Sequence, residues 1–293
     1  HYNYEIVSIP RKYSKGAKSS VVLRGRADVD IPANDTLTIH LPQFKMQEGY
    51  DYYVNFSGEQ SWNQYPLGDC TIAQVATTAK KAKVEFEVNA ESGIIEKYKV
   101  NGVDYIADGF GLRPNYWRAP IDNDYGNGAP ARWQAWKVYG KENKPAEVTD
   151  QMVGENRVVK IVYNLEDLGC SNVVTYTIEP SGILTVEAQM SEASFKEAPR
   201  YGVRWRMPQE FANVRFYGRG PWENYCDRKD GAQFAIYSCT VDDMYVPYVR
   251  PQENGHRVDT RWLEIKNAKG RGLVIHAVGT PFEFNALHNS VED

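Results

Sequence analysis

Residues 157–190 read RVVKIVYNLEDLGCSNVVTYTIEPSGILTVEAQM and contain three runs in which strand-forming residues alternate with polar ones. The runs cover 157–165, 172–180 and 183–190. Alternation with a period of two predicts β-strands that have one buried and one exposed face. Between the last two runs, EPSGI (179–183) places Ser and Gly where a tight hairpin turn needs them. This stretch therefore predicts antiparallel β-structure.

The same pattern extends over most of the chain and predicts an all-β fold. Further alternating runs lie at 36–42, 51–57, 83–89, 201–208 and 272–278, and NAESGI (89–94) marks another hairpin. The first 80 residues add only a few more strands, at 3–9, 21–31 and 70–76. They suit a small sandwich, and the remainder contains enough strands for a large one. The composition changes over 75–84, which is typical of a linker.

One segment departs from the strand pattern. GAPARWQAWKVYG (128–140) places Pro130 near a helix start, two tryptophans at near-helical spacing, and Gly140 as a stop. It predicts a short helix packed on a sheet. Trp133 and Trp136 are expected in the core, because large aromatic side chains usually contribute buried area.

Bulk composition excludes several classes of protein. The chain has 293 residues, 42% of them hydrophobic, and a formal net charge of -4, so it lacks the positive field that attracts nucleic acid. No run approaches the roughly 20 apolar residues of a membrane helix, and no secretory signal pattern opens the chain. Because it begins with His1, the chain suggests a processed protein or a piece of a longer one. A soluble protein is expected, with the cytoplasm and the periplasm both open as its compartment.

The cysteines and histidines show no metal-binding pattern. Cys70, Cys170, Cys226 and Cys239 lack CxxC spacing, and the five histidines form no HExxH motif. A structural metal site is therefore not expected. The cysteines are interpreted as free, partly buried thiols.

RAPIDNDYG (118–126) crowds acidic and amide side chains into a few residues. A calcium loop of the EF-hand type that started at Asp122 would place Asn127 at position six and Trp133 at position twelve, so that template fails. Two readings remain: a looser cation site, and a turn in which Asp and Asn side chains bond to nearby backbone amides. The turn is favoured as the more common use of these residues.

Two later stretches combine aromatic and polar residues. They are YGRGPWENYCDR (217–228) and YVPYVRPQENGHR (245–257). Aromatic faces beside Glu, Asn and Arg suit a sugar, while the alternative is that the acids and arginines pair to hold long loops together. Taken alone, the stretches favour the structural alternative, because structural ion networks are common. The chain has no nucleophile or nucleotide-binding motif, and a pair of catalytic carboxylates cannot be read from the sequence.

Three motifs together resemble signature stretches of one family, the β-galactosidase small-chain domain of the large β-galactosidases of glycoside hydrolase family 2. They are RAPIDNDYG (118–126), GRGPWENYCDR (218–228) and MYVPYVRPQENGHRVDTRW (244–262), in the family's order. SGEQSWNQYPLGD (57–69) resembles the end of the immunoglobulin-like sandwich that precedes this domain. The resemblance implies an immunoglobulin-like β-sandwich over 1–80 and a galactose-mutarotase-like β-supersandwich over 81–293.

In this family the two catalytic glutamates lie on a (β/α)₈ barrel nearer the N-terminus, and this sequence lacks the alternating strands and helices of such a barrel. The resemblance therefore implies the C-terminal, non-catalytic portion of a retaining β-galactosidase, with no catalytic residue in this fragment and no activity of its own. The implied partners are the rest of the enzyme with its barrel and a galactoside substrate, in a homo-oligomer. No cofactor is expected in this fragment, and a divalent cation stays open for the full-length enzyme.

The resemblance also assigns candidate site residues. RAPIDNDYG is expected near the mouth of the active site, where Arg118, Asp122 and Asp124 would brace the loop by charge-assisted hydrogen bonds. Asn123 belongs to the same loop, and Gly126 is expected to give its backbone freedom. The candidate carbohydrate-binding residues are Trp222, Glu223, Asn224, Glu253 and Asn254.

A further expectation concerns the C-terminal end of the sequence. The family domain continues beyond the stretch that PFEFNALHNS (281–290) matches, so truncation at Asp293 is expected, with an unpaired sheet edge available for association. Two alternatives to the β-galactosidase interpretation stay open: an autonomous carbohydrate-binding module and a mutarotase-like activity. The latter would pair His256 or His276 with Glu253, although no spacing supports it.

Overall fold

The computed structural model describes residues 1–58, 62–75, 80–142, 144–191, 197–250 and 252–292. The chain divides into two compact units. Unit 1 comprises residues 1–75, 212–247 and 254–288, and unit 2 comprises 76–211, 248–253 and 289–293. Each unit consists mainly of antiparallel strands, so the all-β prediction is confirmed.

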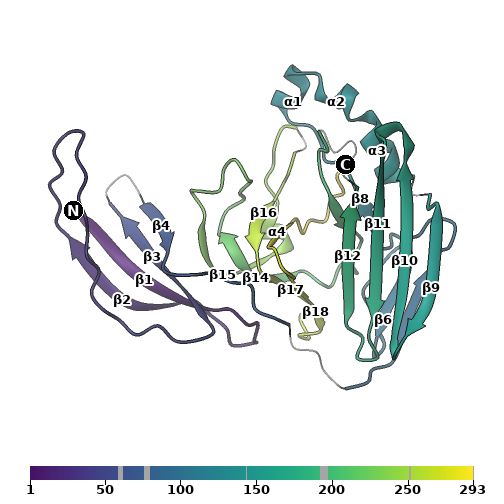
Figure 1. Cartoon of the computed structure of the whole chain (residues 1–293), viewed down its shortest axis with the longest axis horizontal. Helices are drawn as coiled ribbons and strands as arrows, with labels where there is room; N and C mark the ends of the chain where they lie inside the picture. Colours follow the sequence, from purple (N-terminus) through teal and green to yellow (C-terminus); the bar gives the residue numbers. More distant parts are fainter. Residues whose placement is uncertain (59–61, 76–79, 143, 192–196, 251, 293) are drawn as a thin grey trace. The chain divides into compact units, whose positions relative to one another are not determined.

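Unit 1 contains two four-stranded sheets. The first has the order β2-β1-β3-β4 (Figure 1) and comprises β1 (Tyr2–Pro10), β2 (Ser20–Ala27), β3 (Tyr50–Ser57) and β4 (Trp62–Pro66). The second has the order β15-β14-β17-β18 and comprises β14 (Asn213–Gly220), β15 (Gln233–Thr240), β17 (Trp262–Lys266) and β18 (Gly272–His276). The pair β16 (Arg257–Thr260) and β19 (Phe282–Phe284) and the short helix α4 (Val241–Met244) complete the unit.

Apolar and charged contacts join these two sheets. Ile9 and Tyr53 of the first sheet pack with Tyr217 and Trp262 of the second in one buried cluster. The carboxylate of Asp51 is fully buried and accepts hydrogen bonds from the Arg11 guanidinium at 2.6 Å and from the Tyr217 hydroxyl. A buried charge is tolerated only when it is paired, so this network fixes β3 against β14.

The outer strand β15 is covered by side chains rather than by another strand. The Gln64 amide donates to the carbonyl of Phe234 at 3.1 Å and accepts from its N–H at 2.5 Å. The Ser19 hydroxyl accepts from the N–H of Ile236 at 2.8 Å. These groups satisfy backbone positions that an edge strand otherwise leaves open to a partner.

Unit 2 is built on a four-stranded meander with the order β12-β11-β10-β9 (Figure 1). Its strands are β9 (Glu147–Val153), β10 (Asn156–Leu165), β11 (Cys170–Ile178) and β12 (Leu184–Met190), with a 3₁₀ turn η1 (Glu166–Leu168) between β10 and β11. A second sheet has the order β5-β6-β7 and comprises β5 (Val84–Val88), β6 (Ile95–Val100) and β7 (Val103–Asp104). The remaining pair is β8 (Arg113–Asn115) with β13 (Gly202–Arg204).

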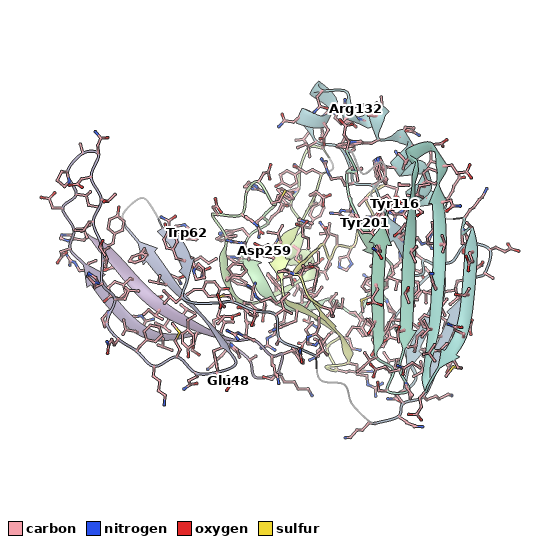
Figure 2. All side chains as sticks on the ribbon, in the orientation of Figure 1. Glu48, Trp62, Tyr116, Arg132, Tyr201 and Asp259 are labelled. Atoms are coloured by element: carbon pink, nitrogen blue, oxygen red, sulfur yellow. The ribbon has the colours of Figure 1, made fainter. Side chains whose placement is uncertain are left out.

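The alternation of β10 and β11 explains the core of unit 2. Their register pairs Val159 with Tyr176 and Ile161 with Val174, and all four side chains are buried. Asn172 lies in the same buried row and is satisfied there, because it donates to the Tyr116 hydroxyl at 2.7 Å and accepts from that of Tyr201 at 2.8 Å. Figure 2 labels these two tyrosines, which lie side by side.

Three helices follow β8 and lie at one end of the β9–β12 sheet (Figure 1). They are α1 (Asp122–Gly126), α2 (Ala129–Arg132) and α3 (Gln134–Lys141). Pro130 stands in the first turn of α2, and Trp133 and Trp136 are buried in the same core as β10 and β11. The prediction of helical structure over 128–140 and of buried tryptophans is therefore confirmed, but the single predicted helix is two short ones separated at Trp133, and the second ends at Lys141 rather than at Gly140. No described helix is long and apolar enough to cross a membrane.

Several strand predictions are wrong or too long. Residues 36–42 form no strand and are mostly exposed, because no neighbouring strand pairs with that run. Residues 71–75 also lack strand structure, and the strand predicted over 201–208 is confined to β13. The hairpins at 89–94 and 179–183 are confirmed, with Gly93 and Gly182 in the left-handed region at φ 69° and 86°. Of the predicted linker, residues 76–79 lie outside the described residues, and the domain boundary at residue 80 stays a prediction.

All four cysteines are free thiols, as predicted. Cys170 is buried, Cys70 and Cys239 are partly buried, and Cys226 is exposed. Burial raises the pKa of the Cys170 and Cys239 thiols, which keeps them protonated and unreactive near neutral pH.

Candidate functional site

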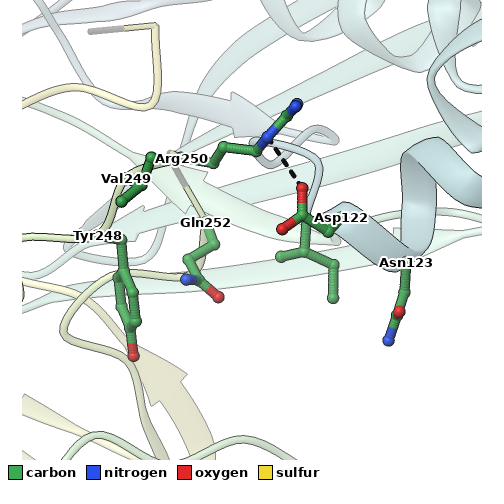
Figure 3. Close-up of a pocket in the computed structure, with 7 residues that line it drawn as sticks. Asp122, Asn123, Tyr248, Val249, Arg250 and Gln252 are labelled. Atoms are coloured by element: carbon green, nitrogen blue, oxygen red, sulfur yellow. Dashed lines mark ion pairs between the residues drawn. The ribbon is translucent and has the colours of Figure 1, made fainter.

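Unit 2 contains a pocket of about 410 Å³, a size suited to a small ligand. Two parts of the chain form it: the start of α1, and residues 248–250 with Gln252 (Figure 3). The lining residues are Ile121, Asp122, Asn123, Tyr248, Val249, Arg250 and Gln252. The pocket thus joins the first and the third of the sequence motifs.

An ion pair spans the pocket. The Nε of Arg250 lies 2.9 Å from Oδ1 of Asp122, and the two side chains are 56% and 81% exposed (Figure 3). The Arg250 guanidinium also lies 5.0 Å from the ring centre of Tyr125. An ion pair this exposed contributes about 0–1 kcal/mol to stability, so both groups can exchange their mutual contact for a ligand at little cost.

The turn under the pocket is braced by Arg118 and Asp124. Two guanidinium nitrogens of Arg118 donate to the Asp124 carboxylate at 2.7 and 3.2 Å, and the N–H of Ile121 donates to it at 2.8 Å. Arg118 also lies 4.8 Å from the ring centre of Trp133. Burial acts to raise the pKa of Asp124, but the bonds from Arg118 and Ile121 outweigh it and hold that pKa below its usual value. Asp124 therefore stays ionised and fixes the first turn of α1.

This geometry corrects two expectations for RAPIDNDYG. Asp122 is not part of the brace, since its carboxylate points to Arg250 while Asp124 takes Arg118. Gly126 ends α1 outside the left-handed region, and a Cβ there would meet no neighbour within 4 Å, so the expected need for backbone freedom is absent. The motif is a short helix whose Asp124 carboxylate bonds to a backbone amide, which is close to the favoured turn.

The same geometry does not fit a metal ion. Both carboxylates of the loop are paired with guanidinium groups, and the described residues contain no cluster of three or more His, Cys, Asp or Glu side chains that could hold a metal. A cation site over these residues would require both arginines to withdraw.

The second set of predicted residues lies mainly in unit 1, and its polar members brace loops. Asn224 is buried, donates to the carbonyls of Trp222 at 2.9 Å and Arg219 at 3.1 Å, and accepts from the N–H of Val258 at 3.1 Å. Glu223 accepts from the Arg228 guanidinium at 2.8 Å and from the N–H of Gly255 at 2.8 Å. These side chains hold the loop that follows β14.

Glu253 and Asn254 belong to different units. Asn254, in unit 1, uses its side-chain amide to bond both the N–H of Val246 at 2.8 Å and its carbonyl at 2.6 Å. Glu253, in unit 2, forms an ion pair with Arg200. His256 bonds Asn285 and Glu283, each at 2.9 Å. Glu253 and His256 thus have structural partners of their own.

Trp222 differs from its neighbours because its side chain is 71% exposed. Its backbone is nevertheless fixed, since Asn224 bonds its carbonyl at 2.9 Å and Arg257 bonds that of Pro221 at 2.8 Å. An exposed indole ring on a fixed backbone offers a flat apolar face to a ligand.

The pocket contains residues that the sequence analysis did not select. Tyr248, Val249, Arg250 and Gln252 stand beside the predicted Glu253 and Asn254 in the third motif. A usable signal existed, because an aromatic, an apolar and a basic residue occur together just before a proline. Chemically, the described lining offers hydrogen-bond donors and acceptors around an aromatic ring, but only one carboxylate.

Comparison with known proteins finds the same kind of relative each time, a beta-galactosidase. Residues 80–293 match a family described as beta galactosidase small chain. The chain is similar to the beta-galactosidase of Priestia megaterium, with 37% identity over 191 residues that cover 65% of this chain and 18% of the relative. The beta-galactosidase of Streptococcus thermophilus is 35% identical over 198 residues, 66% of this chain and 19% of its own length. That of Vibrio cholerae is 27% identical over 283 residues, 82% of this chain and 27% of its own length.

Proposed function

The chain belongs to the β-galactosidase small-chain family, and on that premise we propose that it is a non-catalytic portion of a β-galactosidase. It spans about a fifth of the length of the first two relatives, both of which are named beta-galactosidases. The full-length enzyme would hydrolyse terminal β-galactosides with retention, and its reactive glutamates would lie on a barrel elsewhere in the polypeptide. This chain would complete the mouth of the active site and support assembly.

One observation carries the non-catalytic assignment. Retaining glycosidases use two carboxyl groups about 5–5.5 Å apart. Among the described residues that line the pocket, Asp122 alone carries a carboxylate, and it is paired with Arg250. The pocket therefore lacks the pair that glycoside hydrolysis requires, while its amide, phenol and guanidinium groups suit sugar hydroxyls.

Further features are part of the same proposal. The resemblance of the three motifs implies membership of glycoside hydrolase family 2 and a galactose-mutarotase-like fold for the larger part. The resemblance of residues 57–69 implies an immunoglobulin-like fold for the N-terminal part. The partners would be the barrel-containing polypeptide and a galactoside, in a homo-oligomer of the full-length enzyme.

Substitution at the pocket tests the role at the mouth. In the full-length enzyme, Arg250→Ala is expected to raise the KM for a galactoside severalfold with little change in kcat, because the group would contact substrate away from the reacting bond. Arg132→Ala is the matched control, since Arg132 is an exposed arginine of unit 2 that pairs with Glu197 outside the pocket. Equal KM values for the two variants would show that the pocket does not lie at the active-site mouth.

The exposed Trp222 favours a second candidate, an autonomous carbohydrate-binding module. Calorimetric titration of the isolated chain with galactose and lactose separates the two functions. A mouth that is completed only by the barrel should give no saturable binding. Saturable binding that disappears in Trp222→Ala would instead establish the module.

A further inference from the structure

Three arginines of unit 2 gather on one side of the β8–β13 pair. Arg113 of β8 stands directly opposite Arg204 of β13 in the antiparallel register. Arg206 follows two residues after Arg204 and therefore projects from the same face of an extended chain. Like charges placed directly opposite each other destabilise a strand pair, so this arrangement has an energetic cost. We call Arg113, Arg204 and Arg206 the arginine cluster.

The ring of Phe110 lies at the centre of the cluster. The guanidinium carbons of Arg113, Arg204 and Arg206 lie 4.1, 5.3 and 5.6 Å from its centroid. The backbone of Phe110 is fixed by two hydrogen bonds: its N–H donates to the carbonyl of Ala107 at 3.0 Å, and its carbonyl accepts from the N–H of Arg206 at 3.0 Å. Cation–π attraction favours each guanidinium over the ring, but the ring supplies no negative charge to neutralise the three arginines.

Nearby carboxylates neutralise the positive charges of the arginine cluster unevenly. Glu292 accepts from one nitrogen of Arg204 at 2.8 and 3.0 Å, while Asp108 reaches Arg206 only at 3.4 Å, with both side chains more than half exposed. Arg113 forms no ion pair with any carboxylate of the described residues, and its Nε donates to the carbonyl of Gly111 at 3.1 Å. Nε of Arg204 is buried without a hydrogen-bond partner in the same described set.

The pKa of Arg113 also reflects its burial and the positive charge beside it. Burial and the adjacent charge of Arg204 hold the pKa of Arg113 below its usual value. Tyr163, Glu292 and Glu96 act on it in the opposite sense, but more weakly. The guanidinium nevertheless remains charged near neutral pH, since arginine is protonated under essentially all conditions in proteins.

From this geometry we propose that the arginine cluster is a binding site for an oxyanion, either a phosphate or a carboxylate group of a ligand. The ligand would take the place beside Arg113 that no carboxylate of the described chain fills, and it would relieve the repulsion between Arg113 and Arg204. Guanidinium groups suit this class because their planar donors match two oxygens of a carboxylate or phosphate at once. The site is separate from the pocket of Asp122 and Arg250 and does not depend on the proposed enzymatic role.

Calorimetric titration of the whole chain tests the proposal, with inorganic phosphate and malonate as probes in chloride buffer of constant ionic strength. Saturable binding of at least one probe is expected. Arg113→Gln should weaken it about tenfold or more, since a hydrogen bond to a charged group contributes about 1.5–3 kcal/mol. Arg132→Gln removes the same charge from an exposed site of unit 2 and should leave the affinity unchanged. Arg113→Lys keeps the charge but loses the planar donors, so it should bind severalfold more weakly than the unmodified chain.

The two probes distinguish which oxyanion the site prefers. Tighter binding of malonate identifies a carboxylate as the preferred group, and tighter binding of phosphate identifies a phosphate; both support the site. If Arg113→Gln does not fold, Arg113→Lys carries the comparison. Absence of saturable binding for both probes, or an affinity that neither substitution at Arg113 changes, would overturn the proposal.

Discussion

Replacing Asp124 by asparagine should destabilise unit 2 far more than the same change at Asp122, two residues earlier in the same short helix. The Asp124 carboxylate accepts three hydrogen bonds, at 2.7 and 3.2 Å from Arg118 and at 2.8 Å from the N–H of Ile121. Its side chain is 11% exposed. Hydrogen bonds to charged groups contribute about 1.5–3 kcal/mol each but are not additive within one cluster. We expect a loss of about 2–3 kcal/mol in the free energy of unfolding.

The effect should depend on pH in a defined direction. The pKa of Asp124 is lowered in the folded chain, since the bonds from Arg118 and Ile121 outweigh the opposing effect of burial. A lowered pKa means that the carboxylate stabilises the fold above its unfolded pKa, about 3.9 for Asp. This stability is lost as the pH falls through the lower, folded value. The difference between the unmodified chain and Asp124→Asn should therefore be full at pH 7 and should shrink below about pH 4.

Urea unfolding at pH 7 and at acidic pH measures both effects. With a slope of about 2–3 kcal/mol/M, the midpoint of Asp124→Asn should fall by about 1 M at pH 7. Asp122→Asn is the matched control, because its carboxylate is 81% exposed and its pair with Arg250 contributes about 0–1 kcal/mol. Equal midpoints for the two variants, or a difference that does not change with pH, would refute the assignment of Asp124 as the brace of this loop.

Three further predictions concern the cores and an edge strand. Asp51→Asn should destabilise unit 1 by about 3–5 kcal/mol in urea unfolding, because it removes the charge of a fully buried carboxylate that is paired with Arg11. Glu5→Gln, at an exposed pair, should change stability by less than about 1 kcal/mol. Trp136→Ala should cost about 3–5 kcal/mol, since the indole is only 2% exposed; a loss below about 1 kcal/mol would contradict its place in the core. Gln64→Ala should speed hydrogen exchange at the N–H of Phe234, and unchanged exchange there would show that the glutamine does not cover the edge of β15.

Local patterns predicted much of the fold. Where an alternating run has paired neighbours, as β10 and β11 do, alternate side chains are buried in the core and the strand forms as expected. Residues 36–42 have the same alternation but no strand beside them, and Leu37 is exposed. Pairing is a property of the whole chain, so periodicity alone could not distinguish these two cases.

The candidate site was only partly predictable. Acidic, amide and arginine residues in RAPIDNDYG indicated a braced loop, but the sequence could not show that Arg118 selects Asp124 and leaves Asp122 to Arg250. The partner of Asp122 lies more than a hundred residues away in the chain. Similarly, Glu223 and Asn224 have the composition of a sugar site, yet their side chains bond to the neighbouring loop and strand.

We propose that this chain shapes a galactosidase site whose reactive acids lie elsewhere in the enzyme. The most direct measurement is turnover of nitrophenyl β-galactoside by the purified chain, alone and after mixing with the polypeptide that carries the catalytic barrel. We predict no turnover above the enzyme-free control for the chain alone, and turnover once the two polypeptides are combined. Hydrolysis by the chain alone, in proportion to its concentration and unchanged by further purification, would contradict the claim.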